Sequence, residues 1–161
     1  MRVAVLSDIH DHLSELGRAL QKVADCQVLL FCGDLCAPFT LREIVQSFPG
    51  PIHTVLGNND GDPLLMHKMT RESGRVTIHG DYAELELAGR RIAVVHYPLL
   101  AEGLAALGHY DLVCHGHDHR TRLERRGKTL LLDPGDVMGW QGRPTCAVYD
   151  TEFHKAEILD L

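Results

Sequence analysis

Acidic, imidazole and amide side chains follow short apolar runs at six places in this sequence. Such side chains offer oxygen and nitrogen atoms that can bind a metal ion or move a proton. A short apolar run that ends abruptly at such residues predicts a buried β-strand with polar groups at its carboxyl end. The runs and the polar residues that follow them are residues 3–6 before Asp8 and His10, residues 28–31 before Asp34, residues 53–56 before Asn58, Asn59 and Asp60, residues 91–95 before His96, residues 112–114 before His117 and His119, and residues 130–132 before Asp133 and Asp136.

Two pairs among these residues have a spacing that suits metal binding. Alternate residues of an extended segment point the same way, so Asp8 with His10, and His117 with His119, can each direct two donors to one ion. Open α/β sheets bind ligands beyond the carboxyl ends of their strands, so the six ends can converge on one site. Seven donors of mixed oxygen and nitrogen type favour a pair of ions such as Mn²⁺, Fe²⁺ or Zn²⁺ over Ca²⁺, which prefers oxygen alone. Two-metal sites of this kind are a recurrent means of hydrolysing phosphate esters.

The segments between the runs predict the scaffold that positions these residues. Apolar residues at helical spacing predict four helices, and Thr40 with Glu43 fits a capping box at the start of the second. The predicted helices cover residues 13–23, 41–48, 63–69 and 99–107. The later predicted strands cover residues 76–78, 83–87, 91–95, 112–114, 121–125, 129–132, 146–150 and 157–159. Parallel strands in the first half and a strand-rich second half predict two packed sheets with helices outside.

The composition restricts the architecture and the class of partner. With 45% hydrophobic content, residues 1–161 are expected to form a single domain with a substantial core. The formal net charge of −6 argues against stable nucleic-acid binding. No apolar run approaches the roughly 18 residues of a membrane span, and none resembles a signal peptide, so we expect a cytoplasmic protein without a membrane partner. The five cysteines form no Cys-x-x-Cys pair and are expected to be reduced and mostly buried.

The order of the motifs resembles the signature of the calcineurin-like metallophosphoesterases. It is most similar to that of the small single-domain bacterial and archaeal phosphodiesterases of that superfamily. Each motif is common by chance, but five in this order at strand ends are specific. The resemblance implies an α/β fold, namely a four-layer α/β/β/α sandwich of two mixed sheets flanked by helices. The motifs are Asp8-x-His10, Gly33-Asp34, Gly57-Asn58-Asn59-Asp60, His96 and Gly116-His117-x-His119.

The same resemblance implies a site for two divalent metal ions. Mn²⁺ is the first candidate, with Fe²⁺, Zn²⁺ and Ni²⁺ as alternatives. A hydroxide between the ions would attack a small phosphate ester in line, because bound cations can lower the pKa of water from 15.7 to about 7. The implied ligands are Asp8, His10 and His119 for one ion, Asn58, His96 and His117 for the other, and Asp34 as the bridge.

We therefore expect a phosphodiesterase, and the alternatives left open are a phosphomonoesterase and a protein-binding scaffold with the same fold. The retromer subunit of this superfamily is such a scaffold, but a scaffold would be expected to lose ligands, and all seven positions hold competent donors here. A one-metal hydrolase of another bond is a further alternative, although seven donors exceed the three that a catalytic zinc needs. Because relatives are often dimers or larger, a homo-oligomer is compatible with the resemblance.

Four further residues are candidates for roles in the site beside the metal ligands. Many family members have, at the position of Asn59, a histidine that helps to protonate the leaving group; small relatives lack it. Since asparagine cannot release a proton, His12 is a candidate to contact the substrate and supply one, and His115 is a second candidate for substrate contact. Asp60 is expected to orient a ligand imidazole.

The four residues after the apolar run 130–132 also differ from those of the small relatives. They usually read Asn-Pro-Gly-Ser, whereas this chain has Asp133, Pro134, Gly135 and Asp136. A carboxylate near an anionic substrate is unfavourable, so this departure leaves the substrate class more open than the metal site.

Overall fold

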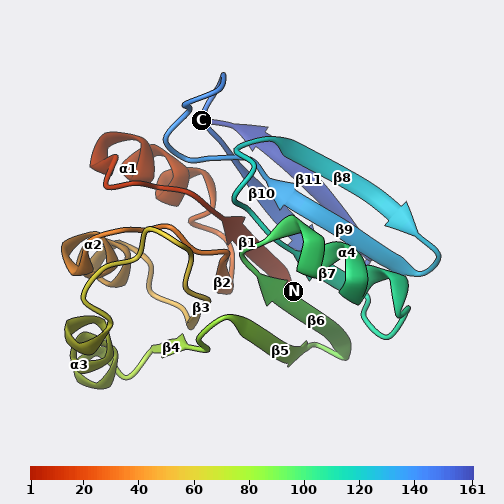
Figure 1. Ribbon diagram of the computed structural model, residues 1–161, viewed down its shortest axis with the longest axis horizontal. Helices are drawn as coiled ribbons and strands as arrows, with labels where there is room; N and C mark the ends of the chain where they lie inside the picture. The colour runs from red at the N-terminus through yellow and green to blue at the C-terminus, as the bar shows by residue number, and fades with distance from the viewer.

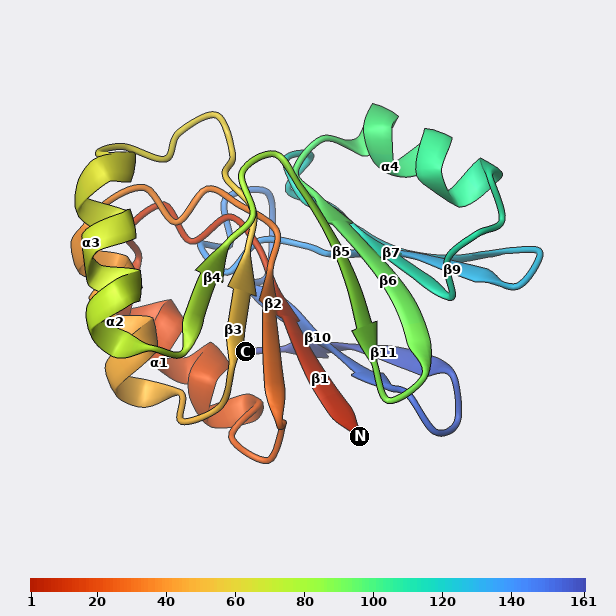
Figure 2. The same ribbon diagram turned by 90° about the horizontal axis from the view of Figure 1, so that it is seen from below.

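The computed structural model describes all 161 residues as two β-sheets packed face to face, with helices on both outer sides (Figures 1 and 2). The layers are three helices, a six-stranded sheet, a five-stranded sheet and a single helix. This arrangement confirms the predicted four-layer α/β/β/α sandwich of two mixed sheets.

The six-stranded sheet contains β1 (Arg2–Leu6), β2 (Val28–Phe31), β3 (Ile52–Thr54), β4 (Val76–Ile78), β10 (Thr145–Asp150) and β11 (Lys155–Asp160). Its order is β11-β10-β1-β2-β3-β4, and β1 to β4 are parallel. β10 pairs antiparallel with β1, and β11 with β10. Leu6 lies opposite Phe31, and Phe31 opposite Thr54, so the first three strands end at one level.

The five-stranded sheet contains β5 (Tyr82–Leu87), β6 (Arg90–Val95), β7 (Leu112–Cys114), β8 (Thr121–Arg126) and β9 (Thr129–Pro134). Its order is β5-β6-β7-β9-β8, with β6, β7 and β9 parallel in the middle and antiparallel strands at both edges. Val94 lies opposite Cys114, and Cys114 opposite Leu132, so these three strands also end level.

Four helices cover the outer faces of the two sheets. α1 (Leu13–Lys22), α2 (Pro38–Ser47) and α3 (Pro63–Ser73) lie on the six-stranded sheet, and α4 (Pro98–Ala106) lies on the five-stranded sheet (Figure 2). Apolar clusters of 20, 15 and 7 buried residues fill the three spaces between the layers. Because strand residues alternate between faces, Ala4 and Leu6 of β1 face the helices while Val3 and Val5 face the second sheet.

All the predicted helices and strands are present, but the capping box was wrong. α2 begins at Pro38, whose ring suits the first position of a helix, and the Thr40 hydroxyl donates instead to Asp11. α3 also runs four residues past its predicted end, to Ser73, and stops at Gly74, where φ is +65°. All five cysteines are free and four of them are buried, as predicted. None of the four helices has the length and apolar character that crossing a membrane requires.

A buried polar pair lies at the carboxyl ends of β7 and β9. His115 and Asp133 are each 1% exposed, and His115 Nδ1 lies 3.2 Å from Asp133 Oδ2. Burial raises the pKa of Asp133 from its ordinary 3.8 to about 8, so this carboxyl group is neutral at pH 7. Asp133 Oδ1 accepts a hydrogen bond of 2.9 Å from the Gly135 amide.

This pair leads to a prediction about stability and pH. Asp133→Asn keeps an oxygen for the Gly135 amide, but it cannot ionise. Since the folded protein keeps a proton that the unfolded chain releases above about pH 4, wild type should lose stability relative to the variant as pH rises from about 4 to about 8, by up to about 1.4 kcal/mol per unit. Urea unfolding across this pH range measures the difference. Asp81→Asn, at an exposed aspartate, should show no such trend, and a pH-independent offset for Asp133→Asn would contradict the neutral carboxyl group.

Candidate metal centre

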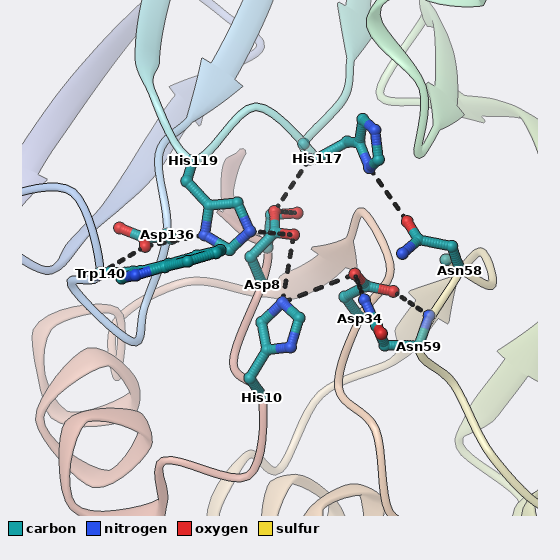
Figure 3. Close-up of polar contacts among 12 residues, drawn as sticks. Asp8, His10, Asp34, Asn58, Asn59, His117, His119, Asp136 and Trp140 are labelled. Carbon is teal, nitrogen blue, oxygen red and sulfur yellow. Dashed lines mark hydrogen bonds and ion pairs between the residues drawn. The ribbon is translucent and has the colours of Figure 1, made fainter.

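The loops that leave the level strand ends of both sheets bring the predicted donors together (Figure 3). The loop after β1 carries Asp8 and His10, and the loop after β2 carries Asp34. The remaining donors lie after β3, at Asn58, after β6, at His96, and after β7, at His117 and His119. Both sheets therefore contribute to one site.

A first group of donors comes from both sheets. Asp8 Oδ1 lies 3.7 Å from His10 Nε2 and 3.7 Å from His119 Nε2. The two imidazole rings stack with their centroids 5.2 Å apart. One carboxylate oxygen and two ring nitrogens thus face a common point.

A second group lies on the other side of Asp34. Asn58 Oδ1 is 3.0 Å from His96 Nε2 and 2.9 Å from His117 Nδ1, and these two nitrogens are 3.3 Å apart. Asp34 Oδ2 lies 3.5 Å from His10 Nε2 and 3.5 Å from His96 Nε2. A single carboxylate oxygen therefore lies between the two groups.

Unsatisfied polar atoms show that this arrangement fits a cation. Asp8 Oδ1 and His10 Nε2 are buried and have no hydrogen-bond partner. Leaving buried polar atoms unpaired costs free energy, so native proteins pair nearly all of them. Both atoms point into the first group of donors, where a divalent ion would satisfy them. The mixture of carboxylate, amide and imidazole donors also matches the borderline divalent metals.

The acidic and imidazole donors shift one another's pKa values toward their charged forms. Burial opposes the ionisation of Asp34, but its contacts with His96 and Asn59 outweigh burial and hold the pKa of Asp34 well below its usual range. The Asp8 carboxylate raises the pKa of His10 above the ordinary 6.5. Burial lowers the pKa of His96, but Asp34 and the Cys32 carbonyl outweigh it, and the net shift is upward. The ionised carboxylate thus creates a negative potential that favours cations.

The backbone at the donors is strained. Five of the seven have positive φ angles, which cost side-chain-bearing residues about 1–2 kcal/mol each. These angles are +53° at Asp8, +45° at His10, +62° at Asp34, +76° at His117 and +55° at His119. Such conformations cluster at functional sites, where the surrounding structure enforces them.

Two glycines permit the close approach of the loops. A Cβ atom at Gly116 would lie 1.9 Å from Ser7 Oγ and 2.5 Å from Asp8 Oδ2. At Gly57 it would lie 2.1 Å from Asp34 Oδ1. Any side chain at either position would displace a donor carboxylate or its neighbour.

Hydrogen bonds outside the donor groups fix the rings of two histidines. His96 Nδ1 lies 2.8 Å from the Cys32 carbonyl oxygen, and His119 Nδ1 lies 2.9 Å from Asp136 Oδ2. Because each Nδ1 then donates its hydrogen, each Nε2 is left with a lone pair that faces the site. The sequence pattern places Asp136 among the strand-end residues after β9 but does not indicate that it orients His119.

Two of the predicted catalytic residues, Asn59 and Asp60, contact Asp34 and its loop. Asn59 donates from its backbone N to Asp34 Oδ1 at 2.8 Å and from its side chain to Asp34 Oδ2 at 2.7 Å, so it holds this carboxylate. The prediction that Asp60 orients an imidazole was wrong. Its carboxylate accepts from three backbone amides, those of Asp34, Gly57 and Cys36, at 3.0, 2.7 and 2.9 Å, because the chain folds back on itself there. Asp60 thus joins two of the donor loops.

The two other histidines do not join the donors. His12 is exposed at the start of α1, and its imidazole forms no hydrogen bond. His115 is buried against Asp133. Two aromatic residues that the sequence analysis missed do contact the donors. The Tyr97 ring centroid lies 5.1 Å from that of His96, and the Trp140 centroid lies 5.2 Å from that of His119.

Comparison with known proteins agrees with this geometry. Residues 1–154 match the calcineurin-like phosphoesterase superfamily domain. The chain is 27% identical to the phosphodiesterase MJ0936 of Methanocaldococcus jannaschii, with 94% of each chain covered. Its fold superimposes on a solved archaeal phosphodiesterase with a TM-score of 0.93, 26% identity and full coverage of both chains. Vacuolar protein sorting 29 from Cryptosporidium parvum shares the fold at 17% identity, with a TM-score of 0.68 and coverage of 98% of this chain and 95% of that one. We conclude that the chain belongs to the calcineurin-like phosphoesterase superfamily, a family of metal-dependent hydrolases of phosphoric esters.

Proposed function

We propose that this chain is a phosphodiesterase that uses two divalent metal ions. The observation that carries the proposal is the convergence of two donor groups on either side of Asp34, with two buried atoms left without partners. One ion would be held by Asp8, His10 and His119, the other by Asn58, His96 and His117, and Asp34 would contact both. Mn²⁺ is the first candidate, and Fe²⁺, Zn²⁺ and Ni²⁺ also suit this donor set.

The residues of the chain would act by holding and orienting. When bound, the ions would polarise a phosphoryl oxygen and lower the pKa of a water molecule, so no protein nucleophile is required. Asn59 fixes both oxygens of Asp34, and Asp136 fixes the ring of His119. Such outer contacts orient ligands before the metal arrives and commonly change metal affinity when they are removed.

Two further observations favour a diester over a monoester. A relative that matches almost the full chain is named a phosphodiesterase. In addition, Tyr97 and Trp140 contact opposite donor groups, and they are 40% and 70% exposed. A diester has an organic group on each side of its phosphorus atom, so two aromatic surfaces suit it. The complete set of donors argues against a scaffold that has lost its metal site.

The metal centre itself can be tested by metal content. Wild type should hold two divalent ions per chain, and Asp34→Asn should lose both, because the altered oxygen lies between the two donor groups. Elemental analysis of the purified proteins measures this. Asp118→Asn is the matched control, since it changes an exposed carboxylate between two donor histidines and should keep both ions. One tightly held ion in both wild type and Asp34→Asn would rule out the two-metal site.

A second prediction concerns the proton that the leaving group needs. Asn59 stands where a histidine could release a proton and asparagine cannot, so activated aryl esters should be cleaved well and alkyl esters poorly. Asn59→His should raise activity on alkyl esters more than on aryl esters, by up to about 100-fold, if its ring reaches the leaving group. If His12 already supplies the proton, His12→Ala should slow alkyl esters selectively.

A leaving-group series measures both effects. Asn59→Ala is the control for Asn59→His, because both lose the side-chain bond to Asp34 and only the histidine can donate a proton. Equal slopes of log kcat/KM against leaving-group pKa in all four proteins would show that neither position protonates the leaving group.

A further inference from the structure

A polar cavity opens beside the candidate metal centre, on the side of His119. Its volume is about 310 Å³, and none of its lining residues is hydrophobic. His119 and Asp136 belong to its wall, so the cavity adjoins the first donor group directly. The other lining residues are Arg120, Thr121, Gly135, Gln141, Gly142, Arg143 and Thr145.

The cavity has an excess of positive charge. Arg120 is exposed and forms no ion pair or side-chain hydrogen bond. Arg143 pairs with Asp160 at 2.5 Å, yet its side chain is 80% exposed, so part of its guanidinium remains accessible. The carboxylate of Asp136 is occupied by His119 and by the Trp140 amide. An arginine without a partner beside a polar cavity suits an anion with oxygen acceptors, and phosphate fits such a donor well.

Trp140 lies next to His119 and Asp136, the two residues that the cavity shares with the metal centre (Figure 3). Its ring meets the His119 ring edge to face, with an interplanar angle of 90°, while 70% of the residue is exposed. Its backbone N–H donates to Asp136 Oδ2 at 2.8 Å, and Asp136 also holds His119. The backbone of Trp140 is therefore tied to the donor group by a shared carboxylate, and its ring rests against His119. Exposed aromatic rings of this kind can stack on nucleobases.

We propose that Trp140 and the cavity beside it form a subsite for a nucleotide portion of the substrate. The base would stack on Trp140, and a phosphate other than the scissile one would bind Arg120 and Arg143 in the cavity. This inference rests on the proposed phosphodiesterase function and specifies its substrate as a nucleotide diester that carries a further phosphate. A ligand with only a planar ring would leave the cavity empty, and a ligand with only a phosphate would make no stacking contact with Trp140.

The subsite can be tested by binding, without turnover. Trp140 is the only tryptophan of the chain, so its fluorescence reports on this position alone. The probes are adenosine monophosphate and an adenosine bisphosphate with one phosphate on each side of the ribose. Both should quench Trp140, and the bisphosphate should bind about tenfold more tightly, as expected for a charge-assisted hydrogen bond from Arg120. Arg120→Ala should abolish that difference in affinity, whereas Arg71→Ala, at an exposed arginine on α3, should keep it.

Several results would overturn the subsite. These are absence of quenching by either probe, quenching by inorganic phosphate as strong as by the nucleotides, or an unchanged bisphosphate preference in Arg120→Ala. A kinetic arm tests the stacking surface. Trp140→Ala should lower kcat/KM for a phosphate-bearing dinucleotide about tenfold, while Phe153→Ala, which removes another exposed aromatic, should not. Equal values for the two variants would also overturn it.

Failure of the subsite can be distinguished from failure of the proposed function. Bis(4-nitrophenyl) phosphate carries no second phosphate, so its hydrolysis by wild type tests the proposed function without the subsite. If wild type cleaves this ester but does not bind the nucleotide probes, the proposed phosphodiesterase function is supported and the proposed subsite is wrong. If wild type cleaves no diester with any of the candidate ions, the proposed function itself fails, whatever the fluorescence shows.

Discussion

The site depends on a close contact between the two sheets at their carboxyl ends. The Gly116 backbone from one sheet lies against Ser7 and Asp8 from the other, so near that a Cβ atom would overlap the Ser7 hydroxyl. The next residue, His117, donates its backbone N–H to Asp8 Oδ2 at 3.0 Å. This contact sets the separation between the loops of the two sheets. Two backbone hydrogen bonds from the loop after β9, Val137 N–H to the Ser7 carbonyl and Met138 N–H to the Asp8 carbonyl, support the same contact, whereas the core between the two sheets is apolar.

The sequence predicted the fold well because its signals are local. Each apolar run is followed by polar residues where a strand ends. Because β1, β2 and β3 end at the same level, these polar residues lie close together in the fold. Predictions failed where the outcome depends on contacts between distant residues. The Thr40 hydroxyl caps no helix because Asp11 accepts its hydrogen, and Asp60 binds backbone amides because the chain folds back between Asp34 and Gly57. Trp140 was missed for the same reason, since no spacing in the chain relates residue 140 to His119.

The two aspartates that replace Asn and Ser in the loop after β9 have different surroundings, although their sequence positions look alike. Asp133 is buried and neutral, so it does not repel an anionic substrate. Asp136 is 3% exposed, and its Oδ2 is shared between His119 and the Trp140 amide. Asp136 lines the cavity beside His119, but both of its hydrogen bonds use one oxygen that it shares between His119 and the Trp140 amide. The main effect of these two replacements is therefore that Asp136 orients the donor histidine His119. Their effect on the electrostatic potential around a phosphate ester is smaller.

The position of β1 in the middle of its sheet also governs the order in which the protein can be completed during synthesis. β1 pairs with β2 on one side and with β10 on the other. In the sequence, all five strands of the second sheet lie between β1 and β10. On the ribosome, all seven donors emerge before β10, so one edge of an apolar strand stays open while they appear. That edge can close only after β10 and β11 have been synthesised, because they follow every other strand in the chain. A nascent chain stalled before residue 145 would carry every metal donor and still expose an edge prone to aggregation.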